Sequence, residues 1–135
     1  MAKTQAGFSL DVLFRALADT TRLRLLNLIA DREICVCYFV EILKISQPKI
    51  SRHLAYLRRA GIVAARRQGR WMHYRLAAPG NAVAAAILIE TLAQLRQVPE
   101  MRRDLAKLET SCCKPDSPQL PRQAPQPLIL PAAAP

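Results

Sequence analysis

Acidic residues are missing from the middle of this chain of 135 residues. Between Lys44 and Arg75 there is neither Asp nor Glu, and this window supplies +9 of the formal net charge of +10. Its basic residues are Lys44, Lys49, Arg52, Arg58, Arg59, Arg66, Arg67, Arg70 and Arg75. A solvated basic face normally keeps interspersed acids for solubility and for i,i+4 ion pairs. The absence of acids therefore favours a surface that lies against nucleic-acid phosphates over a solvated face without a partner.

Long hydrophobic runs are also missing. The longest one, Ala82 to Ile89, is too short to span a bilayer, and the N-terminus lacks the pattern of a signal peptide. We therefore expect a cytoplasmic protein with no membrane partner, whose four cysteines are thiols and not disulfides. There is no C-x-x-C pair and no βαβ pattern, which a thiol oxidoreductase would need, so we expect no enzymatic activity.

The prolines divide the chain. Seven of the ten follow Lys114, and a proline-rich segment of this kind is typical of a disordered or polyproline-like tail. We assign residues 1–111 to one folded domain and residues 112–135 to a cysteine-containing, proline-rich tail that we expect to be disordered. The apolar residues 128–130 offer a small docking patch in this tail, although an unstructured tail is the simpler interpretation.

Apolar periodicity predicts a mainly helical domain. Residues 9–18 carry apolar side chains at i, i+3, i+4 and i+7, and Asp19 is expected to cap a second helix that runs through Ala30. A shorter apolar segment, residues 36–43, is followed by a helix in which Ser46 is the expected cap. Pro48 falls in the first turn of this helix, where proline is tolerated, and Gly61 ends it.

Two helices joined by three residues, 44–46, indicate a helix-turn-helix. The second helix is the expected recognition helix, and its start carries the candidate DNA-binding residues Gln47, Lys49, Ser51, Arg52 and His53. Arg and Lys suit guanine, Gln suits adenine and Ser serves either base. We rank His53 below the others, because a histidine here can equally pack or contact a phosphate.

After Gly61 the apolar pattern changes to a period of two. Residues 62–67 and 70–76 flank Gln68-Gly69, which predicts a β-hairpin whose turn glycine supplies a positive φ. Arg66, Arg67 and Arg70 cluster at its tip, where they can hold phosphates or enter the minor groove. The predicted fold class is thus mainly α with a small β-hairpin, a winged helix-turn-helix that occupies residues 1–111.

The last predicted helix is unusually apolar. It runs from Asn81 to about Val98, where Pro99 interrupts it, and only Glu90 is charged between residues 82 and 95. This is more apolar surface than one small core can cover, so we expect a homodimer through the terminal helices. A dimer places two recognition helices about one DNA turn apart, and the expected partner is therefore double-stranded operator DNA with an inverted repeat.

The cysteines form two pairs. Cys35 and Cys37 lie at the start of the first helix of the helix-turn-helix, and Cys112 and Cys113 lie where the folded domain meets the tail. Cysteine is often a small buried hydrophobe, and C-x-C is a weaker metal signal than paired C-x-x-C sets. Residues i and i+2 of a helix point about 200° apart, so Cys35 and Cys37 can bind one ion only if the backbone there is unwound. Structural and metal-binding roles both remain open on spacing alone.

Three stretches carry a resemblance to a known family. They are E-I-C-V-C (residues 33–37), S-Q-P-K-I-S-R-H-L-A-Y-L-R-R-A-G-I-V (residues 46–63) and R-Q-G-R-W-M-H-Y-R-L (residues 67–76). Together they resemble the ArsR/SmtB family, specifically its arsenical-resistance repressors. The resemblance covers about residues 13–76 strongly, and the last helix only in character.

This resemblance implies a homodimeric repressor that leaves its operator when trivalent arsenic or antimony binds cysteine thiolates. Cys35 and Cys37 match the first two thiols of the family's C-V-C-x-x-C inducer motif, whereas the third position is Val40. A soft trivalent metalloid prefers thiolate ligands, so a third thiolate would have to come from Cys112 or Cys113.

Other repressor functions compete with this interpretation. A zinc-sensing relative would place His and acidic ligands on its last helix, where this chain has neither of its histidines, His53 and His73. Soft divalent ions such as Cd²⁺ or Pb²⁺ remain possible ligands of four thiols. A redox-sensing repressor is a further alternative, because Arg32 and Lys114 flank the cysteines and can lower their pKa values.

Overall fold

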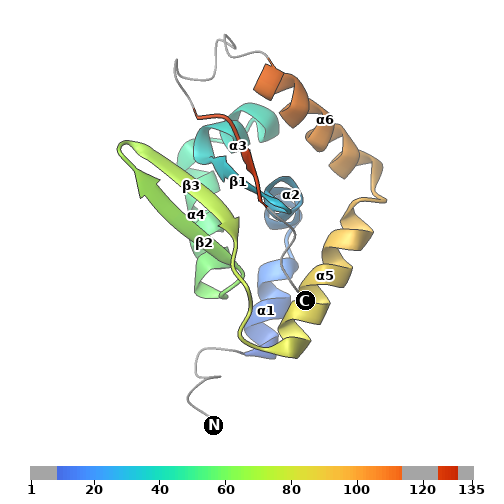
Figure 1. Cartoon of the computed structure of the whole chain (residues 1–135). Coiled ribbons are helices and arrows are strands. Elements are labelled where there is room, and N and C mark those ends of the chain that lie inside the picture. Colours follow the sequence, from blue (N-terminus) through green and yellow to red (C-terminus); the bar gives the residue numbers. More distant parts are fainter. Residues whose placement is uncertain (1–8, 114–124, 131–135) are drawn as a thin grey trace.

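The computed structural model describes residues 9–113 and 125–130 (Figure 1). The helices are α1 (Leu10–Leu17), α2 (Thr20–Ile29), α3 (Val36–Leu43), α4 (Gln47–Arg59), α5 (Ala82–Leu95) and α6 (Pro99–Cys113). The strands are β1 (Arg32–Cys35), β2 (Val63–Gln68), β3 (Trp71–Leu76) and β4 (Leu128–Ile129). The fold is therefore mainly α with a small antiparallel sheet, as the sequence predicts.

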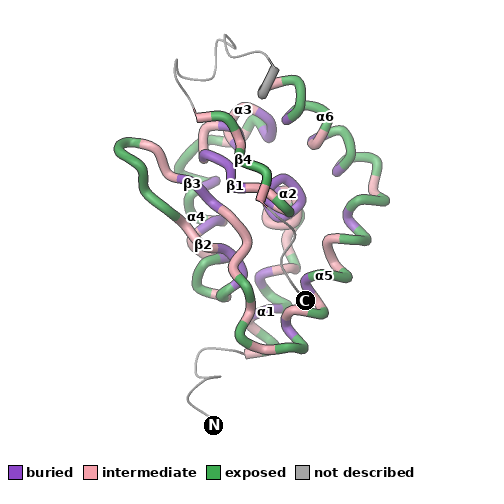
Figure 2. The backbone as a smooth tube through the Cα atoms, viewed as in Figure 1, coloured by how far each residue is buried: buried purple, intermediate pink, exposed green. Residues whose placement is uncertain are grey.

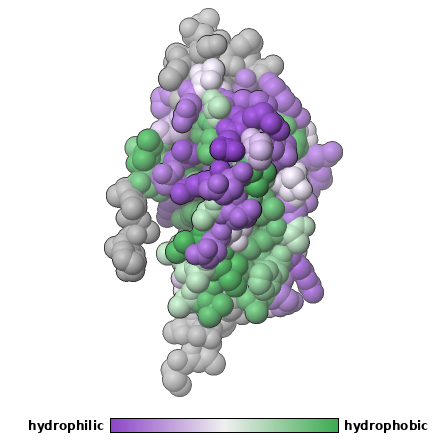
Figure 3. Space-filling model, turned by 90° about the vertical axis from the view of Figure 1, so that its right-hand side faces the viewer, coloured by the Kyte–Doolittle hydropathy of each residue, from purple (hydrophilic) through white to green (hydrophobic). Residues whose placement is uncertain are grey.

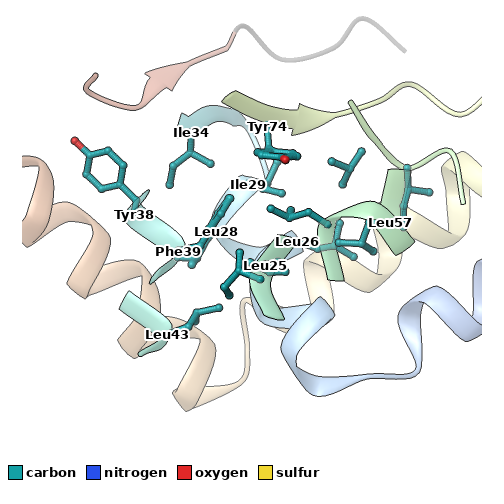
Figure 4. Packing of buried hydrophobic residues seen from close by; sticks show 14 of the residues in the cluster. Leu25, Leu26, Leu28, Ile29, Ile34, Tyr38, Phe39, Leu43, Leu57 and Tyr74 are labelled. Carbon is teal, nitrogen blue, oxygen red and sulfur yellow. The ribbon is translucent and has the colours of Figure 1, made fainter. Parts of the chain in front are cut away.

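Helix α2 lies at the centre of the molecule. The β2–β3 hairpin lies on one side of it and α5 and α6 on the other, and its last five residues, 25–29, are all buried (Figures 1 and 2). Around it pack Ile34, Phe39, Leu57 and Tyr74 from the sheet, α3 and α4 (Figure 4). Each fully buried Leu or Ile contributes roughly 1.5–3 kcal/mol to the free energy of unfolding, so one core around α2 holds the helices together.

The sheet has the strand order β2-β3-β1-β4 with antiparallel pairs throughout. Its hairpin β2–β3 is the predicted wing, but the turn lies one residue later than expected. Gln68 pairs with Trp71, so Gly69 and Arg70 form the turn, and Gly69 has a φ of 60°. A two-residue turn with glycine in its first position is of type II′, and this geometry explains the shift.

Asp19 caps α2 as predicted, Asn81 caps α5 in the same way, and Ser46 is the predicted N-cap residue of α4 without a capping side chain. Asp19 Oδ2 accepts a hydrogen bond from the backbone N–H of Arg22 at 3.0 Å, and Asn81 Oδ1 accepts one from Val83 at 2.9 Å. Ser46 occupies the N-cap position of α4, but its side chain makes no capping hydrogen bond. The start of α4 is instead fixed by Pro48, whose φ suits a first helical turn.

The predicted last helix is α5, which ends at Leu95, and it is followed by a further helix that was not predicted. Pro99 does not end the helical region but begins α6, which continues to Cys113. The guanidinium of Arg24 on α2 donates two hydrogen bonds to the buried carboxylate of Asp104 at 2.8 and 2.9 Å. Asn27 Nδ2 donates to the carbonyl oxygen of Met101 at 3.0 Å. These bonds attach α6 to the central helix.

The division predicted at residue 111 between a folded domain and a disordered tail differs from the structure in two respects. α6 extends two residues past it, and residues 128–129 of the expected disordered tail form β4, which pairs with β1. The remaining predicted tail, residues 114–124 and 131–135, lies outside the described residues. Among the helices that the structure describes, none has the length and apolarity needed to cross a membrane.

Candidate nucleic-acid interface and thiol site

Helix α4 presents its polar face to solvent. Ile50, Leu54 and Leu57 are buried in the core. The predicted DNA-binding residues Gln47, Lys49, Ser51 and Arg52 are exposed. The turn between α3 and α4 passes through Lys44 in the left-handed conformation, with φ 56° and ψ 40°. The structure thus forms the predicted helix-turn-helix with an exposed second helix.

A basic cleft of about 770 Å³ lies between α2 and α4. Its lining residues are Thr21, Arg22, Ile45, Lys49, Arg52, His53, Ala55, Tyr56 and Arg59. His53 lies on the side of α4 that faces α2, because its Nδ1 is 3.7 Å from Asp19 Oδ2 and 3.4 Å from Arg22 Nη1. This placement separates His53 from the more exposed residues at the start of α4.

Arg22 is held in a fixed orientation in this cleft. Its guanidinium donates to the carbonyl oxygens of Ala16 and Arg15, each at 2.8 Å, and lies 4.2 Å from the centroid of the Tyr56 ring. The sequence offered no motif for this residue, since its partners come from α1 and α4. A positive group preorganised in this way suits a phosphate better than a flexible surface lysine does.

The three arginines of the wing have different environments. Arg66 donates to the buried carboxylate of Glu33 with Nη2 2.6 Å from Oε1, and Arg75 lies 3.7 Å from the same carboxylate. The Arg66 guanidinium holds the pKa of Glu33 below its usual value. Arg67 is exposed, and Arg70 lies in the turn with its guanidinium 4.6 Å from the Trp71 ring centroid. Arg67 and Arg70 are therefore the wing arginines that form no ion pair within residues 9–113 and 125–130.

Cys35 and Cys37 face each other at the junction of β1 and α3. Cys35 is the N-cap residue of α3, with φ −73° and ψ 144°, so it is extended and not helical. Its Sγ accepts a hydrogen bond from the Cys37 thiol at 3.3 Å. The sequence analysis allows both sulfurs to bind one ion only if the backbone there is not helical, and the strand-to-helix junction at Cys35 meets this condition.

The hydrogen bond between the thiols makes the pair chemically unequal. Because the Cys37 S–H and the backbone N–H groups of Cys37, Met72 and Val36 stabilise the thiolate, the pKa of Cys35 falls to about 7. The pKa of Cys37 is raised, since ionising it would remove the donor and place two negative sulfurs side by side. Cys35 is therefore the thiol of the pair that ionises first, and the thiolate is the form that binds soft ions.

The thiol pair opens into a cavity that also touches both elements predicted to face DNA. The cavity has a volume of about 260 Å³ and is lined by Cys35, Val36, Cys37, Gln47, Arg70, Trp71 and Met72. Gln47 belongs to α4, and Arg70 to the wing turn. The structure thus brings two predicted thiol ligands together with two predicted DNA-binding residues.

The other two predicted thiols are at a different place in the fold. Cys112 and Cys113 are the last two residues of α6, and their side chains lie outside the described part of the structure. The neighbouring Ser111 lines a groove with Glu41, Ile42 and Lys44, at the C-terminal half of α3. Cys35 and Cys37 are at the opposite end of α3. No group of three or more His, Cys, Asp or Glu side chains suited to a metal occurs within residues 9–111 and 125–130.

An apolar patch covers part of α1 and α5. Leu10 and Phe14 on α1 and Val83 and Ile89 on α5 are large hydrophobic residues that are 46–64% exposed. The green area in the lower half of Figure 3 shows this apolar character over the α5 side of the molecule. Leu88 faces the core instead, with 4% exposure. The apolar surplus predicted from the sequence therefore exists, at Val83 and Ile89 of α5 and not at Leu88.

Comparison with known proteins identifies the family. Residues 19–65 match the model of the bacterial regulatory protein, arsR family. The chain is 45% identical over 101 residues to the arsenical resistance operon repressor of Escherichia coli, with 73% of this chain and 86% of that protein covered. The chain belongs to the arsR family. The resemblance predicted from the C-V-C and S-Q-P-K-I-S-R-H-L stretches is confirmed.

Further relatives support the winged-helix fold. The arsenic resistance transcriptional regulator ArsR1 of Pseudomonas putida is 56% identical over 66 residues, which are 48% of this chain and 52% of that protein, so the chain matches only about half of its length. HlyU from Vibrio cholerae superposes with a TM-score of 0.57 at 33% identity, over 73% of this chain and 100% of that one. The AntR antimony-specific transcriptional repressor superposes with a TM-score of 0.52 at 31% identity, over 64% of this chain and 77% of that one. This arsR-family chain is therefore a winged helix-turn-helix regulator.

Proposed function

We propose that this arsR-family protein is a transcriptional repressor that binds operator DNA as a homodimer and dissociates when As(III) or Sb(III) binds cysteine thiolates. The observation that carries the proposal is the thiol pair, 3.3 Å apart, in a cavity lined by Gln47 of the recognition helix and Arg70 of the wing. Relatives named for arsenic resistance and an antimony-specific structural neighbour support the choice of inducer. The protein acts in the cytoplasm, where its thiols stay reduced.

In this proposal the DNA contacts fall into two groups. Gln47 and Ser51 on the exposed face of α4 read base edges in the major groove. Lys49, Arg52 and His53, which line the cleft beside α2, hold backbone phosphates on one side of that groove. On the other side of the groove, the wing arginines Arg66, Arg67 and Arg70 bind backbone phosphates or enter the minor groove.

The exposed apolar faces of α1 and α5 supply the dimer contact. Leu10, Phe14, Val83 and Ile89 leave 46–64% of their surface exposed, and the same patch on a second copy is the simplest cover. Dimerisation doubles the number of phosphates contacted and restricts the target to an inverted repeat.

The separation of the sulfurs favours a trivalent ion. With sulfur bonds of about 2.3 Å, as in zinc–thiolate sites, two sulfurs 3.3 Å apart subtend about 92° at the bound ion. A trivalent arsenic or antimony centre with a lone pair bonds at angles close to a right angle, whereas Zn²⁺ prefers the wider tetrahedral angle. For the third sulfur we propose Cys112 or Cys113. Because α6 ends beside the other end of α3 in the same chain, this thiol has to move to the cavity or come from the second copy of the dimer.

Inducer binding then acts on the DNA-facing elements through short paths. Cys35 and Cys37 fix the first turn of α3, which packs against α4, and Cys35 pairs with His73 on the wing strand β3. An ion bonded to both sulfurs and to a third thiolate therefore acts on the helix that supports Gln47 and on the strand that carries the wing. Each ligand weakens the other by the same free energy, typically ~1–3 kcal/mol.

A thiol-based redox switch is the second candidate, together with response to Cd²⁺ or Pb²⁺. One observation favours the redox function: a thiol with a pKa of about 7 beside a second thiol is suited to oxidation to a disulfide. Oxidation by peroxide removes two electrons and two protons from the pair and forms the S–S bond.

The test uses fluorescence anisotropy of the reduced protein on a duplex that carries its operator. We expect arsenite or trivalent antimony to release the wild-type protein with thiols still reduced. Cys35→Ser and Cys37→Ser should bind the operator with nearly unchanged affinity, because neither residue lies on the exposed face of α4, and should not respond to the metalloid. Release by peroxide alone, with no response to either metalloid, would replace the proposal by the redox alternative.

A further inference from the structure

The outer edge of β1 is covered by the C-terminal segment of the same chain. Strand β4 pairs antiparallel with β1, with Arg32 opposite Ile129 and Glu33 opposite Leu128. The backbone N–H of Leu130 donates to the carbonyl oxygen of Asp31 at 2.8 Å. In Figure 1 this segment, drawn in red, crosses over β1 on the side away from β3.

Without this segment β1 would be the edge of the sheet. An edge strand presents unpaired N–H and C=O groups that accept another extended chain. Proline cannot donate a ladder hydrogen bond, and Pro127 and Pro131 stand directly before and after residues 128–130 in the sequence. The segment is thus suited to pair along three residues on one side and to resist further strand addition.

The contact is held by the main chain more than by side chains. Leu128 and Ile129 keep 57% and 74% of their surface exposed, so pairing buries little apolar area. Few buried apolar contacts and solvent-exposed backbone hydrogen bonds are the marks of a segment that opens at low free energy. Docking of β4 is therefore reversible without unfolding of the domain.

β1 connects this contact to the thiols. The strand has four residues, ends at Cys35, and is fixed on its inner side by the pairing of Cys35 with His73 and of Ile34 with Tyr74. On its outer side β4 pairs with Glu33, two residues before the first thiol. The backbone that presents Cys35 to Cys37 is therefore held from both sides only while β4 is docked.

We propose that the outer edge of β1 is a docking site for the extended apolar segment 128–130, and that the docked segment keeps the thiol pair preformed. The part that concerns the metalloid rests on the proposed function. The part that concerns the thiol arrangement does not, because it can be read from the reduced, ion-free protein. Chains with the segment docked should bind the metalloid more tightly than chains without it.

The hydrogen-bond alternation of an antiparallel pair supplies a matched test. Because Leu130 N–H bonds to Asp31, the neighbouring Ile129 lies at a position whose N–H points away from β1. Leu130→Pro therefore removes a docking hydrogen bond, whereas Ile129→Pro introduces the same ring and removes none. A chain that ends at Ala124 lacks the segment and keeps Cys112 and Cys113.

The primary measurement is amide hydrogen exchange in the reduced full-length chain and these variants. The Glu33 amide reports docking, since Glu33 lies in a hydrogen-bonded pair with Leu128, and the Cys37 amide reports the thiol arrangement, since it bonds to Cys35. We expect both amides to exchange at least tenfold faster in Leu130→Pro and in the shortened chain, and at the wild-type rate in Ile129→Pro. Arsenite affinity, measured by competition, should fall several-fold in the same two variants.

Unchanged exchange at Glu33 in the shortened chain would overturn the docking site. Faster exchange at Glu33 with unchanged exchange at Cys37 and unchanged arsenite affinity would overturn the link to the thiols. If the wild-type protein itself fails to bind arsenite, the proposed inducer is wrong, and the two amides still decide the docking proposal.

Discussion

Glu33 and Arg66 form an ion pair with 2.6 Å between Oε1 and Nη2, although they lie on strands β1 and β2, which are separated by β3. The buried carboxylate thus reaches across a strand to hold the wing, and Arg75 joins it at 3.7 Å. The strand that presents the first thiol and the strand that carries the wing arginines are therefore tied by charge as well as by the β-ladder. Part of the positive charge of the wing is balanced inside the protein.

Replacing this carboxylate should strengthen non-specific DNA binding. Glu33→Gln keeps the shape of the side chain but leaves the charges of Arg66 and Arg75 unbalanced at the surface, so we expect higher affinity for scrambled DNA. The slope of log K against log salt should become steeper by roughly one phosphate contact. Anisotropy titrations at several salt concentrations measure this slope. Glu90→Gln, an exposed change on α5, is the charge-matched control, and an equal effect of both variants would contradict the role of Glu33.

The salt dependence of DNA affinity should distinguish residues that contact bases from residues that contact phosphates. Ser51→Ala should relax base preference by about 1–3 kcal/mol between the operator and a variant site, with little change in salt slope. Arg67→Ala and Arg70→Ala should weaken binding to all sequences and flatten the slope. Arg103→Ala on the exposed face of α6 serves as the control that should change neither. Equal affinity of the wild type for operator and scrambled DNA at every salt concentration would exclude sequence-specific repression.

The thiol pair predicts that the thiolate of Cys35 forms as the pH rises and that the pH at which it forms depends on Cys37. The pKa of Cys35 is about 7, below the usual value of roughly 8.5, so its thiolate forms as the pH rises through 7. Cys37→Ala removes the hydrogen-bond donor and should move this transition to higher pH, because burial alone raises a thiol pKa. Thiolate ultraviolet absorbance in a Cys112→Ser, Cys113→Ser background measures it. A midpoint that does not move in Cys37→Ala would show that the two sulfurs do not interact.

Charge placed in the apolar patch should separate the dimer. Ile89→Glu or Val83→Glu on α5 introduces a carboxylate into the expected two-fold contact, so light scattering should show monomers whose operator affinity falls by at least tenfold. Gln94→Glu, at an exposed position of the same helix, should leave the dimer intact. A wild-type protein that is monomeric at micromolar concentration and still binds the full operator would refute the dimer.

Removing or replacing the cysteines at the end of α6 tests whether one of them is the third thiolate ligand. A chain truncated after Ser111 should bind As(III) more weakly and respond only at higher concentration, while it still represses. It also lacks β4, so the chain that ends at Ala124 is its control, and the additional loss between the two belongs to Cys112 and Cys113. Cys112→Ser and Cys113→Ser made separately identify the ligand. Three sulfurs per arsenic by X-ray absorption in the truncated chain would assign these cysteines another role.

The helices and the wing could be predicted because their signals are local. Apolar periodicity, caps such as Asp19 and Asn81 and the change of period after Gly61 are all visible in a few residues. β1 was missed because Arg32 and Glu33 break the apolar pattern, and its stability comes from β3 and β4, which are distant in sequence. α6 was missed because Pro99 was interpreted as a stop, although proline also begins helices.

The geometry of the candidate site depends on β1, the strand that the sequence does not predict. A helical Cys35 would point away from Cys37, and only the strand-to-helix junction at Cys35 brings the sulfurs together. The pairing of Arg66 with Glu33 and the anchoring of Arg22 join residues from different elements, which a single sequence does not reveal. Residue types and spacing therefore predict the thiols and the candidate DNA-binding residues, while their mutual arrangement requires the fold.

Gln47 lines the same cavity as Cys35 and Cys37, so in the proposed function the inducer site and the base-contacting surface have a side chain in common. They are not independent modules that an engineer can exchange one at a time. A biosensor retargeted to a new operator by changing Gln47 would also have its dose response altered, because the side chain next to the inducer has changed. Ser51, which does not line that cavity, is the position where operator preference can be redesigned while the response to the metalloid is kept.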